Sequence, residues 1–371
     1  MSPFFQEQSS RFLHWFEEAA LPFWATRARD EKGGFFEVLD LYGRPLVDTP
    51  KRLRVQARQA FSFARADMLG LYAGRDASDH AFDFLLSHGQ AEEGFVHTLN
   101  PDGSVLDGRL DLYDHAFVLL ACAERYRAYR DARALDTAQF VLSVLDGLRM
   151  EAGGYAEGNP PNSLRRQNPH MHLFEALMVM QQADMPLDQD DRLEEIRQLF
   201  KDVLYDDEAH VIREFFDENW NLHPEKGQEA EPGHMVEWAW LAAQGGIDSV
   251  SHDLINKART VGYHDETALM ANMVQLMTGH DSGACRLWPQ TEHVRAITML
   301  ARWGDGSFDQ AALHLQRTMD RYFPEELGGG YHDEFAVDGT QLSQHMPSSS
   351  LYHLITMADE IVLARQDLSA P

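Results

Sequence analysis

The sequence lacks most features that mark specialised classes of protein. Its 371 residues include only two cysteines, Cys122 and Cys285, which suit a reducing compartment and cannot form a disulfide framework. Basic residues are scarce, because 32 Lys and Arg stand against 59 Asp and Glu, for a formal net charge of −27. Such a charge repels phosphate backbones and anionic lipids, so we expect no nucleic-acid or membrane partner. Polyanionic substrates are also disfavoured unless arginines gather locally.

Long apolar runs are missing as well. The longest, residues 117–123, is far too short to span a bilayer, and residues 1–24 lack the basic and apolar regions of a signal peptide. We therefore expect a soluble cytoplasmic protein. Because no Pro/Ser-rich linker divides the chain, we expect one domain over residues 1–371, with a frayed tail at 366–371.

What the sequence does contain is a repeat. Gly-aromatic pairs start at Gly34, Gly94 and Gly154, at intervals of 60 residues, and another starts at Gly330. An interval of this length fits two helices and their connections. Apolar residues recur at helical spacing between the pairs, and short alternating segments that end in turns predict small hairpins in the loops.

These patterns predict an all-α fold, because no apolar strand is long enough for a central sheet. Six helix pairs of about 60 residues would fill the chain and close into an (α/α)6 barrel with short β-hairpins in the loops at one end. An open α-solenoid is the alternative. Polar clusters occur in almost every repeat, which favours the closed ring, because a ring would place all of them around one central cleft.

Histidines recur where helices are expected to begin, and imidazoles beside carboxylates suit proton transfer in both directions. His172 and Glu175, like His234 and Glu237, are three residues apart after a proline, which places each pair on one helix face. An ordinary helix cap is the alternative for each pair. His170 and His172 together could also bind a metal, but acidic residues nearby are few, so we expect none.

Four further residues are candidates for a functional role. His353 lies near the start of the last long helix, where a lone histidine is more often a core or cap residue. Arg58 interrupts an apolar helix, so its guanidinium needs acceptors from a carboxylate or from sugar-like oxygens. Trp288 and Glu292 combine an aromatic plane with a carboxylate, as carbohydrate pockets do, although Trp288 could equally belong to the core.

Six short motifs occur in one order between residues 52 and 354: Ala57-Arg58-Gln59, Tyr113-Asp114-His115, Asn168-x-x-Met171-His172-x-x-Glu175, Pro232-Gly233-His234-x-x-Glu237-Trp238, Arg286-x-Trp288-Pro289-x-x-Glu292 and Tyr352-His353-Leu354. Together they resemble the N-acylglucosamine 2-epimerase superfamily, which includes cellobiose 2-epimerases and mannose isomerases. Each motif is weak alone, whereas six in order are specific. The resemblance implies an (α/α)6 barrel, in agreement with the repeat.

The resemblance also implies roles for individual residues. His353 matches the general base that takes the C2 proton of an open-chain sugar, and His234 matches a second acid/base that Glu237 orients. Arg58 matches the arginine that stabilises the developing enediolate oxygen. The residues implied to bind or line the sugar are Tyr113, His115, Asn168, His172, Glu175, Trp288 and Glu292.

A proton returned to C1 makes a ketose, whereas a proton returned to the other face of C2 makes an epimer. The sequences of residues 168–172 and 346–353 resemble mannose isomerases more than acyl-sugar epimerases. We therefore expect a cofactor-independent isomerase that interconverts the unmodified monosaccharides D-mannose and D-fructose. We expect it to be a monomer or homodimer. The alternatives are a 2-epimerase of N-acylglucosamine, mannose or cellobiose type, a glycoside hydrolase with Glu237 and Glu292 as its carboxylates, and a non-catalytic carbohydrate-binding protein.

Overall fold

The computed structural model describes residues 2–160, 162–247 and 249–367. The chain divides into two compact units. The first unit comprises the described residues of 1–28, 38–46 and 230–371, and the second comprises those of 29–37 and 47–229. No helix within the described ranges combines the length and the apolar character that crossing a membrane requires.

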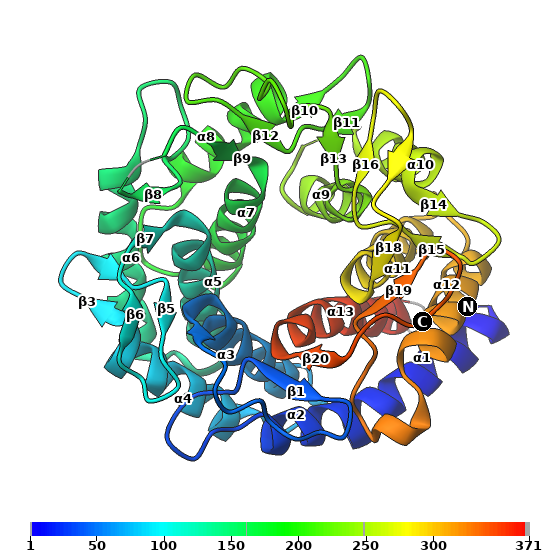
Figure 1. Ribbon diagram of the computed structural model, residues 1–371, viewed down its shortest axis with the longest axis horizontal. Helices are drawn as coiled ribbons and strands as arrows, with labels where there is room; N and C mark the ends of the chain where they lie inside the picture. The colour runs from blue at the N-terminus through cyan, green and yellow to red at the C-terminus, as the bar shows by residue number, and fades with distance from the viewer. Residues whose placement is uncertain (1, 161, 248, 368–371) are drawn as a thin grey trace. The chain divides into compact units, whose positions relative to one another are not determined.

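The second unit is built from two layers of helices (Figure 1). Its first layer holds three helices side by side, α3 (Leu53–Met68), α5 (Leu112–Tyr129) and α7 (Gln167–Gln182). Each packs against the helix that follows it in the chain, α4 (Arg75–Phe84), α6 (Ala132–Leu148) or α8 (Asp190–Leu199). Short π-helical turns, Leu85–Gly89 and Phe200–Leu204, extend α4 and α8.

The first unit repeats this arrangement. Its first layer consists of α9 (Pro232–Gln244), α11 (Leu287–Arg302) and α13 (Leu351–Asp367). The second layer contains α10 (Ser251–Gly262), α12 (Phe308–Tyr322) and α1 (Pro3–Trp15), and α1 continues through the π-helical turn Phe16–Ala20 into α2 (Leu21–Arg27). Helix α13 extends two residues into the tail predicted from Gln366, and residues 368–371 lie outside the described ranges.

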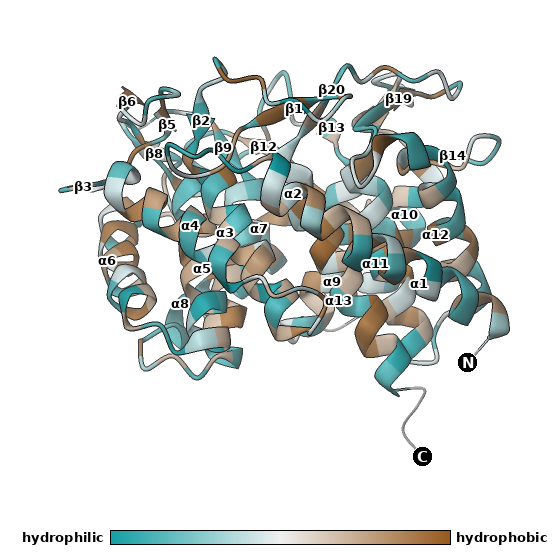
Figure 2. Cartoon of the chain, turned by 90° about the horizontal axis from the view of Figure 1, so that it is seen from below, coloured by the Kyte–Doolittle hydropathy of each residue, from teal (hydrophilic) through white to brown (hydrophobic). Residues whose placement is uncertain are grey.

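Hydrophobic patterning accounts for the two layers. In α5 every residue from Ala116 to Ala123 is buried, so this helix needs neighbours on all sides. In α12 the buried apolar residues Ala311, Ala312, Leu315 and Met319 form one stripe and leave a polar face for solvent. Figure 2 shows this mixture of hydrophilic and hydrophobic residues along α12.

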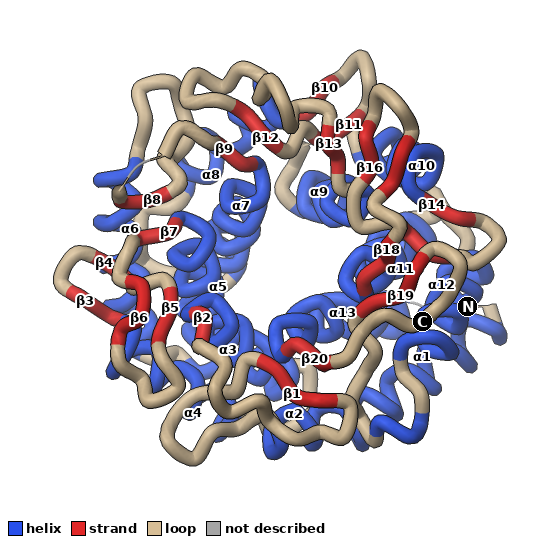
Figure 3. The backbone as a smooth tube through the Cα atoms, viewed as in Figure 1, coloured by secondary structure: helices blue, strands red, loops and turns tan. Residues whose placement is uncertain are grey.

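The strands are two or three residues long and lie in the connections between helices (Figure 3). This confirms the predicted short hairpins. The antiparallel pairs of the second unit are β2 (Lys51–Arg52) with β5 (Thr98–Leu99), β5 with β6 (Val105–Asp107), β3 (Gln90–Ala91) with β4 (Gly94–Phe95), β7 (Leu110–Asp111) with β8 (Gly158–Asn159), β9 (Arg165–Arg166) with β12 (Phe215–Phe216), and β10 (Tyr205–Asp206) with β11 (Val211–Ile212).

In the first unit the antiparallel pairs are β1 (Val38–Asp40) with β20 (His345–Pro347), β14 (Tyr263–His264) with β15 (Leu269–Met270), β16 (Val274–Gln275) with β17 (His280–Asp281), and β18 (Ala284–Arg286) with β19 (Glu334–Ala336). Strand β13 (Glu229–Ala230) falls where the chain passes from one unit to the other. Two 3-10 turns, Glu325–Leu327 and Ser348–Ser350, complete the elements.

The fourth residue of several first-layer helices fixes a loop. The main-chain N–H of Phe35 donates to the Gln56 side chain at 2.7 Å, and the Gln56 amide donates back to the Phe35 carbonyl at 2.9 Å. Gln290 of α11 makes the same pair of bonds with Met270, at 2.8 and 2.9 Å. These amides satisfy buried main-chain groups that no strand pairs. A Cβ at Gly34 would lie 2.5 Å from the Gln56 oxygen, which explains the glycine before Phe35.

His115 and His170 occupy the same fourth position in α5 and α7. Nε2 of His115 accepts from the Phe95 N–H at 3.0 Å, and Nε2 of His170 accepts from the Tyr155 N–H at 3.0 Å. The Nδ1 atom of each ring lies 2.8 or 3.1 Å from a main-chain carbonyl of its own helix start. Burial lowers the pKa of both imidazoles, to about 4 for His170, so both are neutral at pH 7.

These contacts explain the first three Gly-aromatic pairs, because each aromatic residue is tied by its main chain to the next first-layer helix. They also account for His115 and His170 as supports of loops. Among the described residues no contact ties His115 to a sugar site, so that role stays a prediction, and none joins His170 and His172 to one metal ion.

A buried ion pair joins α3 to α5 and generates a prediction about stability. Arg65 binds Glu124 through two bonds, Nε–Oε1 at 2.5 Å and Nη2–Oε2 at 2.6 Å, and the side chains are 9% and 0% exposed. Replacement Glu124→Gln removes the charge that compensates a buried guanidinium. We expect the free energy of unfolding, measured by urea denaturation, to fall by about 3 kcal/mol.

The matched control is Asp320→Asn, which breaks the exposed pair with Arg11, where the side chains are 48% and 55% exposed. Its expected cost is less than about 1 kcal/mol. Equal losses in the two variants would show that the buried pair contributes no more than a surface pair.

Candidate active site

The first turns of the first-layer helices in the first unit bring together residues that are far apart in the sequence. His234 is the third residue of α9, Trp288 the second of α11 and His353 the third of α13. The Trp288 ring centroid lies 5.0 Å from that of His234 and 5.5 Å from that of His353, with planes inclined at 38° and 35°. One indole therefore contacts both imidazoles.

The Pro232-Gly233 step makes this arrangement possible. Pro232 suits the first position of α9, where no intrahelical N–H bond is lost. A Cβ at Gly233 would lie 2.5 Å from the Trp288 ring, so only glycine allows the indole to pack against the start of this helix.

His353 is held by a buried carboxylate. Its Nδ1 lies 2.7 Å from Oε1 of Glu292, which is fully buried, while His353 is 6% exposed. Burial by itself would raise the pKa of Glu292, but the nearby Arg295 charge and the hydrogen bond with His353 outweigh it and lower that pKa below its ordinary value. An ionised Glu292 accepts from the Nδ1–H of His353. In that tautomer Nε2 carries the lone pair that takes up a proton.

Further side chains hold Glu292 in turn. Arg295 donates from Nη1 to Oε2 of Glu292 at 3.1 Å, and its guanidinium lies 3.5 Å from the centroid of the Trp240 ring. The Trp240 indole N–H donates to Glu360 at 2.8 Å, and Arg302 binds the other oxygen of Glu360 at 2.8 Å. Contacts among α9, α11 and α13 thus determine where the Glu292 charge sits.

Two more carboxylates lie near the imidazoles of the first unit. Oε2 of Glu231 is 3.6 Å from Nδ1 of His234. Glu237 is buried and offers an oxygen within 4.8 Å of ligand atoms of Glu292 and His353, a set that could hold a metal ion. The positive charge of Arg295 on Glu292 opposes a cation there. The prediction that Glu237 orients His234 stays a prediction.

A second polar cluster forms in the second unit, on α3, α5 and α7. Nη2 of Arg58 donates to the Tyr113 hydroxyl at 2.9 Å, and the Arg58 guanidinium lies 4.2 Å from the Phe117 ring centroid. His172 contacts both rings, at 5.3 Å from Tyr113 and 4.5 Å from Phe117, and its Nδ1 is 3.2 Å from Glu175. The second unit therefore gathers four of the predicted residues, with Phe117 as an addition.

Asn168 lies in the first turn of α7 and is half-buried. Its Oδ1 is buried and has no hydrogen-bond partner within the described part of the chain. A buried carbonyl oxygen normally accepts a hydrogen bond, so this atom is suited to a substrate hydroxyl.

The structure assigns Glu292 a bond to His353 that sequence reasoning missed. Glu231, Arg295 and Phe117 were missed too. A signal for the first of these contacts existed, because Glu292 and His353 are 61 residues apart, which is one repeat. Glu231 also precedes His234 by three residues, the spacing that singled out Glu237.

Comparisons with known proteins identify the family and the fold. Residues 34–357 match the family described as N-acylglucosamine 2-epimerase (GlcNAc 2-epimerase). The "Mannose-6-phosphate isomerase" of Rhizobium meliloti (strain 1021) is 31% identical over 95% of this chain and 96% of that protein. A "Cellobiose 2-epimerase" of Bacteroides fragilis is 23% identical over 86% of this chain and 89% of its own length.

Among solved structures, the cellobiose 2-epimerase from Spirochaeta thermophila DSM 6192 matches with a TM-score of 0.88 and 20% identity, over 100% of this chain and 99% of that one. The predicted (α/α)6-barrel fold is thereby confirmed. With a family match over residues 34–357, the chain belongs to the N-acylglucosamine 2-epimerase family.

Proposed function

We propose that the protein is a cofactor-independent aldose–ketose isomerase for sugars of mannose and fructose configuration, with D-mannose and D-fructose as the simplest pair. Members of its family are sugar isomerases and epimerases. The single observation that carries the proposal is the His353–Glu292 hydrogen bond at 2.7 Å, because it prepares a neutral imidazole to act as a base. The 31% identical relative is named as an isomerase of a mannose phosphate, which supports a mannose skeleton.

In the proposed reaction Nε2 of His353 takes the proton from C2 of the open-chain aldose. The ionised Glu292 stabilises the imidazolium that forms, just as it orients the neutral ring before the step. Arg58 stabilises the enediolate oxygen, a role suited to a guanidinium that a tyrosine and a phenylalanine already position. Protonated His234, oriented by Glu237, opens the ring and then delivers its own proton to C1, while the O2 proton moves to O1 and leaves the C2 carbonyl. His353 gives up the C2 proton to solvent and His234 regains a proton from solvent, so both groups return to their starting states.

Sugar hydroxyls would be bound by the remaining polar groups. His172 and Glu175 form one donor–acceptor pair, and the Oδ1 of Asn168 supplies an acceptor. Tyr113 and Trp288 offer ring faces for the C–H faces of the sugar, as aromatic residues do in carbohydrate pockets.

A 2-epimerase is the second candidate, because both reactions use the same base and the same enediolate and differ in where the proton returns. The similarity to a cellobiose 2-epimerase keeps this candidate open. In deuterated water, we expect D-mannose to give D-fructose that carries deuterium at C1, as read by NMR. Conversion of mannose to glucose alone, with deuterium at C2, would assign the protein as an epimerase instead.

His353→Ala is expected to lower turnover by roughly 10²–10⁴, because it removes the base and leaves only water in its place. Circular dichroism should show the same helix content. The matched control is His252→Ala, which alters a surface histidine with a 52% exposed side chain and should leave turnover unchanged. Near-normal activity of His353→Ala would end the assignment of His353 as the base.

Arg295→Gln tests whether Arg295 is a positioning residue. The change keeps a hydrogen-bond donor but removes the charge that lowers the pKa of Glu292. Glu292 then takes up a proton at higher pH, so we expect the acid limb of the pH–rate profile to move to higher pH. We also expect kcat to fall by about tenfold or more with KM little changed.

Arg295→Lys keeps the charge and should restore part of kcat and the original acid limb. If Arg295→Gln lowers stability but leaves the pH profile in place, Arg295 supports only the fold.

A further inference from the structure

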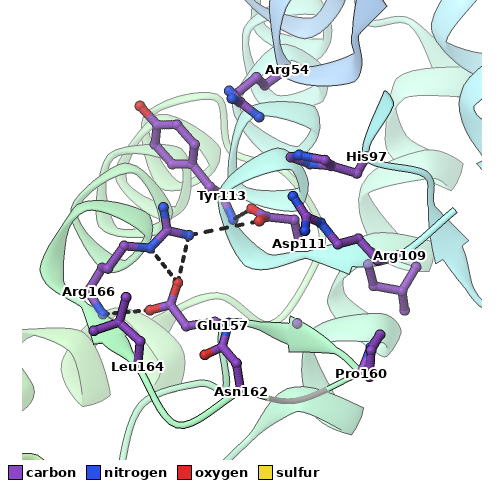
Figure 4. A pocket seen from close by; sticks show the side chains of 12 residues that line it. Arg54, His97, Arg109, Asp111, Tyr113, Glu157, Pro160, Asn162, Leu164 and Arg166 are labelled. Carbon is purple, nitrogen blue, oxygen red and sulfur yellow. Dashed lines mark hydrogen bonds and ion pairs between the residues drawn. The ribbon is translucent and has the colours of Figure 1, made fainter. Parts of the chain in front are cut away.

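The second unit contains a cavity of about 540 Å³ that is rich in arginine (Figure 4). Arg54, Arg109 and Arg166 line it, together with His97. In a chain with 32 basic and 59 acidic residues, three guanidiniums around one cavity stand out from the average composition. Such a grouping is the local exception under which an acidic protein can bind an anion.

The two carboxylates that line the cavity, Glu157 and Asp111, already interact with other groups of the protein. Glu157 accepts from the main-chain N–H of Arg166 at 2.6 Å and from its guanidinium at 2.8 Å. Asp111 caps α5 by accepting from the Tyr113 N–H at 2.9 Å, and it lies 3.8 Å from the Arg166 guanidinium. Figure 4 shows both carboxylates turned toward Arg166. They therefore offset the charge of Arg166, whereas the carboxylates next to Arg54 and Arg109, Asp114 and Asp107, lie outside the lining.

Within the described part of the chain, Arg54 and Arg109 use few of their N–H donors. Arg54 donates one hydrogen bond, from Nη1 to Asp114 at 3.0 Å, and the other oxygen of Asp114 lies 2.5 Å from Nδ1 of His97. Arg109 makes a long contact of 3.4 Å with Asp107, and its side chain is 52% exposed. Since a guanidinium carries five N–H donors in a planar fork, these two residues can bind a tetrahedral oxyanion through several charge-assisted bonds.

The cavity adjoins the cluster that contains Arg58. Arg54 precedes Arg58 by one turn of α3, about 6 Å along the helix axis. Both guanidiniums lie against the same phenol ring, at 5.4 and 5.8 Å from the Tyr113 centroid. Tyr113 thus belongs both to the lining of the cavity and to the cluster that contains Arg58.

We propose, on the basis of the proposed function, that this cavity binds a phosphate monoester at C6 of the sugar, so that the preferred substrate is a hexose 6-phosphate. A phosphate monoester brings up to two negative charges and three acceptor oxygens, which matches the spare donors of Arg54 and Arg109. A second, neutral sugar ring fits the lining less well. Tyr113 is the one aromatic residue that the described lining offers, whereas three of its residues are arginines.

The first test compares kcat/KM for D-mannose 6-phosphate and for D-mannose. We expect the wild-type ratio to favour the phosphate at least tenfold and Arg109→Gln to lower that ratio about tenfold, the effect of losing one charge-assisted hydrogen bond. Arg54→Lys, which keeps the charge next to buried Asp114, should lower it by a smaller factor. Arg133→Gln is the matched control, because its side chain is also 52% exposed but lies outside the cavity, and its ratio should equal that of the wild type.

A wild-type ratio of one or less, or a ratio that Arg109→Gln leaves unchanged, would overturn the phosphate site while leaving the isomerase proposal in place. Turnover of cellobiose but not of mannose 6-phosphate would also overturn it, in favour of a second sugar ring.

Calorimetric titration of the full chain with inorganic phosphate separates the site from the activity. Binding to the wild type and to Arg133→Gln, with loss of binding in Arg109→Gln, supports the site even if neither sugar is isomerised, in which case the proposed function alone fails. Binding of phosphate with equal affinity to all three proteins would count against the site.

Discussion

The buried carboxylate of Glu292 links the packing of the first unit to its chemistry. A charge in a fully buried position is tolerated only if its oxygens are matched, and here His353 and Arg295 match them. Arg295 is itself fixed on the Trp240 ring, and Trp240 on Glu360, so side chains from α9, α11 and α13 converge on one group. The orientation of the imidazole is thus a consequence of how three helices pack.

Polar contacts of this kind recur between neighbouring first-layer helices. Arg54 binds Asp114 across 60 residues, Arg65 binds Glu124 across 59, and Glu292 binds His353 across 61. Each separation is close to one repeat, because equivalent heights on adjacent helices are one repeat apart. These helices are apolar on most sides, so a buried polar group finds its partner on the neighbouring helix. The pairs therefore select the register in which the helices pack.

The recurring histidines serve two different purposes. At the fourth position of a first-layer helix, His115 and His170 accept main-chain N–H groups and hold loops, as Gln56 does on α3. Glutamine performs the same task without a titratable group, which shows that proton transfer is not what this position needs. His353, by contrast, is bound to a buried carboxylate. Spacing alone cannot separate the two groups, because all of these residues lie in or near the first turn of a helix.

The sequence by itself determined the repeat, the helical character of the chain, the short loop hairpins and the family, because periodicity and ordered motifs reflect local backbone geometry. Only the tertiary structure decided that Glu292 orients His353, that His115 supports a loop, and that Arg54, Arg109 and Arg166 surround one cavity. The physical reason is that a side chain's partner depends on the register between elements. A side chain's own helix fixes which way it points, whereas the packing of neighbouring helices fixes which group it meets.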